Sequence, residues 1–122
     1  MNELIDRLVT KTGVERPAAE RAVGIILDFL LKEGPTDKVQ GLVDKMPGAA
    51  QLVANEQSGA GGGFFGGMGG IMGAANRLMA AGLSMGQVQS VTREVVAYAR
   101  ETAGEDTVGE IVGSVPGLSQ FV

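Results

Sequence analysis

Carboxylates are the only side chains in this sequence suited to catalysis. The chain has no cysteine and no histidine, which excludes thiolate nucleophiles, imidazole triads and Cys/His zinc sites. Four acids lie close together and would suit acid–base chemistry or a hard cation: Glu101, Glu105, Asp106 and Glu110. They do not follow an EF-hand pattern, and two of them fit a helix first turn, where carboxylates offset the dipole. We therefore expect no enzyme activity, no metal and no cofactor.

The glycine-rich stretch in the middle of the chain has three interpretations. Gly61–Gly66 matches G-x-G-x-x-G, but dinucleotide binding requires a preceding strand, and a helical pattern precedes it here. The four-residue spacing of Gly62, Gly66 and Gly70 is typical of a membrane glycine zipper. However, each glycine disfavours a helix by about 1 kcal/mol, and Arg77 ends the apolar stretch early. We therefore expect a connector between two packed units.

Large apolar side chains lie among these glycines and shortly after them. Exposed, they would be the best candidates for contact with a partner or an apolar ligand, and packing onto the core is the competing interpretation. The candidate interaction or ligand residues are Phe64, Phe65, Met68, Ile71, Met72 and Met79.

Helical spacing of apolar residues predicts the elements of the first half. One stripe covers Leu4–Val9 and ends at Gly13, and a longer one follows Pro17 and stops at Gly34-Pro35. Thr36 is expected to cap a third helix. A Pro-Gly break and a short last turn or two, over residues 49–54, follow it.

The same order of elements returns after the glycines. A short helix ends at Gly82, and Ser84 with Gln87 forms a capping box before a long helix. That helix ends at Gly104, and a last apolar stripe leads to Pro116-Gly117.

This order indicates an internal repeat. Residues 14–53, shifted by 69, lie on 83–122 without a gap. The identical pairs all fall late in the alignment: Asp37/Asp106, Val39/Val108, Val43/Val112, Pro47/Pro116, Gly48/Gly117, Gln51/Gln120 and Val53/Val122.

The sequence therefore predicts an all-α fold, a small helical bundle built from two similar halves. We expect a single domain over 1–122, with repeat 1 at about 1–54, a Gly-rich connector at 55–70 and repeat 2 at about 71–122. Two such units pack on each other because neither buries its apolar stripe well alone.

Charge and hydropathy limit the partners and the location. The net charge is −4 without a basic cluster, so nucleic acid is not an expected partner. The longest apolar run, Ala22–Leu31, is too short to cross a bilayer, and the N-terminus does not resemble a signal peptide. We expect a soluble, cytoplasmic protein. Asp28, inside that run, is expected to face solvent or to cap a helix.

The arrangement resembles the Vcg-type family, a family of small bacterial helical proteins known only as a domain of unknown function. The resemblance covers most of the chain from Ala22 onward, and this chain departs from it by a second Pro-Gly end. The matching segments are Met46-Pro47-Gly48, Gly61–Gly73, Ala81-Gly82-Leu83 and Val95–Tyr98. The resemblance implies a helical fold and no established activity.

Three function classes follow from these observations. The leading one is a non-enzymatic interaction or scaffold protein that self-associates. The alternative is a module that binds a small apolar ligand or lipid in a cleft between the halves, lined by Phe64, Met68, Met72 and Met79. An acid-dependent hydrolase is the third and weakest.

Overall fold

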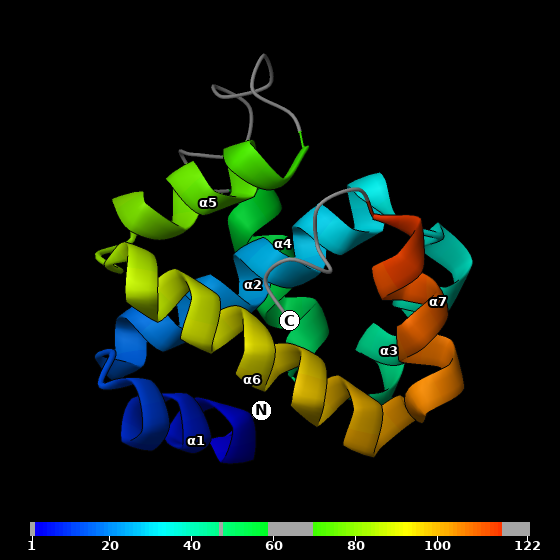
Figure 1. Ribbon diagram of the computed structural model, residues 1–122, viewed down its shortest axis with the longest axis horizontal. Helices are drawn as coiled ribbons and strands as arrows, with labels where there is room; N and C mark the ends of the chain where they lie inside the picture. The colour runs from blue at the N-terminus through cyan, green and yellow to red at the C-terminus, as the bar shows by residue number, and fades with distance from the viewer. Residues whose placement is uncertain (1, 47, 59–69, 116–122) are drawn as a thin grey trace.

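The structure, a computed structural model, describes residues 2–46, 48–58 and 70–115 and is all-α over these ranges (Figure 1). The expected fold class is confirmed, because every regular element in the described ranges is a helix. The helices are α1 (Asn2–Thr12), α2 (Arg16–Glu33), α3 (Thr36–Lys45), α4 (Ala49–Ser58), α5 (Gly70–Ala80), α6 (Met85–Ala103) and α7 (Glu105–Ser114).

From α1 to α3, the helix ends agree with the sequence signals except at Thr36. Gly13 follows α1 with φ +76°, a backbone conformation that L side chains rarely adopt. Pro35, and not Thr36, occupies the N-cap of α3. The Thr36 hydroxyl instead donates a 3.1 Å hydrogen bond to the carbonyl of Leu31. The reason is that carbonyls in the last turn of a helix lack intrahelical donors and compete for a nearby hydroxyl.

α4 is longer than the one or two turns expected, because it continues to Ser58 through residues assigned to the connector. The rest of the connector, residues 59–69, lies outside the described residues. α5 then begins at Gly70, close to the expected start of the second half.

α2 is the central helix of the bundle. It contacts α1, α3, α4, α5 and α6, and its residues from Ala22 to Leu30 are all buried. A helix that is buried on every side must be apolar on every side, which explains the long apolar run in the sequence. Asp28 is the exception within this run.

The first helix of each half packs against both long helices, and more closely against the one in the other half. α1 packs against α6, the long helix of the second half, and α5 packs against α2, the long helix of the first (Figure 1). The helix starts also follow the 69-residue shift, because Arg16 and Met85 begin α2 and α6, while Thr36 and Glu105 begin α3 and α7. Superposition of the halves, which a duplication requires, stays a prediction.

Candidate functional site

Of the six candidate residues, the structure describes the side chain of Met79 and the backbone of two others. Phe64, Phe65 and Met68 lie outside the described residues. Ile71 and Met72 lie in the first turn of α5, where the structure describes the backbone alone.

Met79, the sixth candidate, lies near the end of α5 and is 39% exposed. Met85, the first residue of α6, is 51% exposed, although it was not among the candidates predicted from the sequence. Its position in the sequence could have indicated exposure, because it directly follows the cap Ser84, whereas the buried stripe of α6 begins only at Val88. The two methionines are the large apolar residues most exposed among the described side chains.

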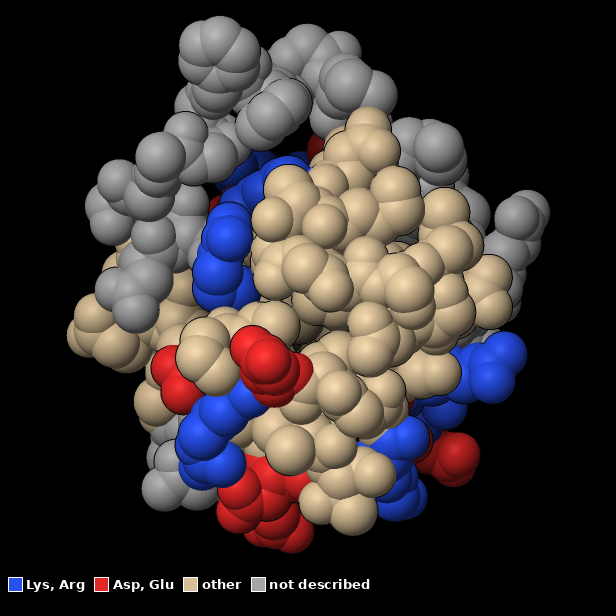
Figure 2. Space-filling model, turned by 90° about the vertical axis from the view of Figure 1, so that its left-hand side faces the viewer, with Lys and Arg blue, Asp and Glu red and all other residues tan. Residues whose placement is uncertain are grey.

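These methionines belong to one surface, which we call the α5–α6 corner. Its members are the exposed residues around the turn between the two helices: Met79, Ala80, Gly82, Ser84, Met85, Gly86 and Gln89. Figure 2 faces this end of the molecule and shows a broad area without charged side chains, with acidic and basic residues at its edge.

The sequence explains why this surface lacks charge. The chain has 10 basic and 14 acidic residues, yet between Glu56 and Arg93 the only charged residue is Arg77. The Arg77 side chain is turned inward and is only 13% exposed. The corner therefore consists of apolar, small and neutral polar groups.

Arg77 contacts a carboxylate that is completely buried. Its Nη1 lies 3.1 Å from Oδ2 of Asp28, whose side chain is 0% exposed. Lys32 Nζ lies 3.1 Å from the same oxygen, one turn along α2. The expectation that Asp28 faces solvent or caps a helix is therefore wrong. A buried carboxylate requires a cation, and Asp28 has one from its own helix and a second from α5, 49 residues later.

Two local motifs fix the path of the chain at the corner. After α5, Gly82 has φ +108°, and the N–H of Leu83 donates to the carbonyl of Leu78 at 3.3 Å, as in a Schellman motif. The expected capping box then starts α6. The Ser84 hydroxyl accepts from the Gln87 N–H at 3.2 Å, and Gln87 Oε1 accepts from the Ser84 N–H at 2.9 Å.

Gly86 contributes no side chain to the corner. It lies inside α6, and a Cβ atom placed on it would meet nothing within 4 Å. Glycine is less favourable than alanine in a helix, and packing among the described residues does not explain Gly86, as it does not explain the equally open Gly41 and Gly109. Small residues at a surface allow another backbone to approach closely.

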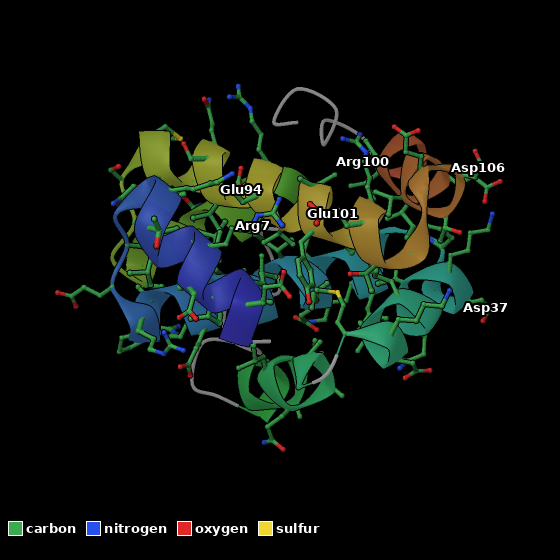
Figure 3. All side chains as sticks on the ribbon, turned by 90° about the horizontal axis from the view of Figure 1, so that it is seen from below. Arg7, Asp37, Glu94, Arg100, Glu101 and Asp106 are labelled. Carbon is green, nitrogen blue, oxygen red and sulfur yellow. The ribbon has the colours of Figure 1, made fainter. Side chains whose placement is uncertain are left out.

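The acidic residues do not form a reactive cluster. Glu101 accepts a 2.8 Å hydrogen bond from Arg7 of α1, which lies between Glu94 and Glu101 (Figure 3). Glu110 pairs with Lys38 of α3. Within the part of the chain that the structure describes, no three acidic residues are grouped so that they could hold a metal ion.

Arg7 also determines the ionisation of its partner. Its hydrogen bond lowers the pKa of Glu101 below the usual value of 4.5, and desolvation opposes this effect only in part. The pKa of Arg7 rises in turn, mainly through the same hydrogen bond. Glu101 is thus a charged partner in an ion pair between α1 and α6, and a structural role accounts for it.

Comparison with known proteins adds no relative. No protein-family model matches this chain, and no curated protein or solved structure is significantly similar to it. The resemblance to the Vcg-type family therefore stays a prediction. Among the described helices, none combines the length and the apolar character needed to cross a membrane.

Proposed function

We propose that this protein is a non-enzymatic interaction protein that associates with a second copy of itself through the α5–α6 corner. The single observation that carries this proposal is the exposure of Met79 and Met85 on a surface without charged groups. Exposed apolar residues gathered on one surface are typical of protein contacts.

Electrostatics favour the corner over other faces as the place where a second copy can bind. Each chain carries a net charge of −4, so two copies repel each other over most of their surfaces. The corner is where this repulsion is weakest. An uncharged surface also offers nothing to attract a strongly charged partner, and it is complementary to itself across a twofold axis.

The proposal predicts how association responds to salt. Ion pairs across an interface weaken as salt is added, whereas repulsion between two acidic chains is screened. Association through the corner should therefore strengthen, or at least persist, when NaCl is raised. Light scattering coupled to size exclusion, over a range of protein and salt concentrations, measures this directly.

Met85→Glu tests the surface itself. A carboxylate at the centre of the interface would be desolvated without a partner, so the variant should be monomeric where the parent chain associates. Gly41→Glu is the matched control, because it adds the same charge at an exposed site of α3 where a Cβ meets nothing within 4 Å. A parent chain that stays monomeric at its highest soluble concentration contradicts the proposal, as does equal association of the two variants.

Gly86→Ala separates a packing role from a contact role. Alanine should raise the unfolding free energy by less than about 1 kcal/mol, which gives a slightly higher unfolding temperature. It should also weaken association, because its methyl group keeps the backbone of the second copy away. Gly109→Ala in α7 is the control, since a Cβ there also meets nothing within 4 Å. It should stabilise the chain without changing association.

Native mass spectrometry of protein taken from cells addresses the alternative, the small apolar ligand or lipid. A retained apolar molecule on a monomeric chain would favour that function over self-association. The exposure of Met79 supports a contact surface more than the lining of a cleft.

A further inference from the structure

The buried pair between Asp28 and Arg77 raises the question of what it does for α5. Exposed ion pairs contribute little to stability, and buried ones often contribute no more than apolar residues of similar size would. Buried pairs are better attested as devices that select one arrangement among several. Helix α5 has a specific need for such a device.

The inward face of α5 has few large side chains among those that the structure describes. Its described buried residues are Gly73, Ala74, Ala75 and Leu78, of which only the last has a large side chain. A face of glycine and alanine packs almost equally well after a small rotation about the helix axis, because it has few protrusions to interlock with α2. Among the α5 side chains that the structure describes, apolar packing alone therefore defines the rotation of the helix poorly.

The contact between Arg77 and Asp28 restricts the rotation of α5 about its axis. It is the only charged residue of α5, and its guanidinium must reach the carboxylate of Asp28, which has no exposure to water. Lys32 also contacts this carboxylate, but its side chain is 53% exposed. A rotation that removes Arg77 therefore takes the more buried of two cations away from a carboxylate without exposure to water, and such rotations are disfavoured. With about 100° of turn per residue, Met79 lies about 200° around the helix from Arg77, on the opposite side.

We propose that the Asp28–Arg77 pair is the positioning element of the α5–α6 corner: it sets the rotation of α5 and thereby holds Met79 on the outside. This inference rests on the proposed self-association for its purpose. The rotation itself is a property of the single chain and is measured without association.

The decisive variant removes both charges. Asp28→Leu combined with Arg77→Met replaces the pair by apolar side chains, so the chain should fold with an unchanged or higher unfolding temperature. With ¹³C-methyl-labelled methionine and dilute protein, the Met79 methyl should give one sharp signal in the parent chain. In the double variant it should be broadened or split, while the signal of Met46, which is buried at the C-terminal end of α3, stays sharp.

Association should weaken in the double variant by about tenfold or more, as expected when a central interface residue is displaced. The matched control is Asp6→Leu combined with Arg16→Met, which removes an exposed pair between α1 and α2 at 2.5 Å. It should leave the Met79 signal and the association unchanged. Asp28→Asn provides a second variant of nearly the same shape, and its Met79 signal should also broaden.

The outcomes separate the two proposals. A single, unshifted Met79 signal in both Asp28 variants overturns the positioning role, whatever the association does. A broadened Met79 signal in a chain whose parent never associates supports the control of α5 by the pair and rejects self-association. A broadened signal together with weakened association supports both.

Discussion

Arg7 of α1 donates a 2.8 Å hydrogen bond from Nη2 to Oε2 of Glu101, which lies 94 residues further along the chain. Its Nε lies 3.3 Å from Glu94, so one guanidinium joins two turns of α6. The counterpart in the other half is Arg77 of α5, which reaches Asp28 of α2. In each half, an arginine of the first helix thus contacts carboxylate groups on the long helix of the other half.

The two contacts occupy related places on their long helices. The 69-residue shift puts Ala97 at the position of Asp28, and Glu94 and Glu101 lie three residues before and four residues after Ala97. That spacing puts all three on one side of α6. The arginine of the first helix therefore contacts one buried acid in the first case and two partly exposed acids in the second.

We expect Arg7→Met to loosen α1 from α6. The variant should unfold at a lower temperature, and hydrogen exchange of α1 amides should become faster, because both contacts across the halves are lost. Arg16→Met, which breaks the exposed contact with Asp6, is the control and should have a smaller effect. Equal effects of the two substitutions would contradict a special role for Arg7.

The same pair predicts a dependence of stability on pH. Because the pKa of Glu101 is lower in the folded chain, its contribution is complete above the ordinary value of 4.5 and is lost as pH falls through the lower folded value. Denaturant unfolding at pH 3 to 7 should show Glu101→Gln less stable than the parent chain near neutrality (roughly pH 5 to 7). The difference should shrink towards the acid end, and a difference that grows there would reverse the sign of the argument.

Helix capping gives a prediction with an internal control. Ser84→Ala removes a hydroxyl that accepts from the Gln87 N–H and should cost about 1 kcal/mol of unfolding free energy. Thr36→Ala should cost less than about 0.5 kcal/mol, since Thr36 does not cap α3. Chemical denaturation of both variants measures the difference, and a larger loss for Thr36→Ala would contradict the assignment of the caps.

Core substitutions compare the energetics of the two halves. Leu42 in α3 and Ile111 in α7 occupy equivalent positions under the 69-residue shift, and both are buried. Replacement of either by alanine should reduce the unfolding free energy by about 2–5 kcal/mol through lost burial and the cavity left behind. A loss far below this range at one site would show that the halves do not contribute alike to the core.

Most helix boundaries could be predicted from local chemistry. Gly13 and Gly104 end their helices with positive φ, and Ser84 with Gln87 starts α6, because these effects act over a few residues. Thr36 failed as a predicted cap because its hydroxyl had a competing acceptor in the preceding helix. The apolar stripes likewise predicted burial at positions such as Val91 and Val108.

Tertiary packing alone decided the rest. Nothing within a few residues of Asp28 shows that an arginine 49 residues later will cover it, or that α1 and α5 will each pack on the opposite half. Likewise, the exposure of Met85 depends on where α5 and α6 meet, although its residue type suggests a core position. Helix ends obey short-range hydrogen bonding, whereas burial, ion pairing and exposed surfaces depend on which distant segments meet.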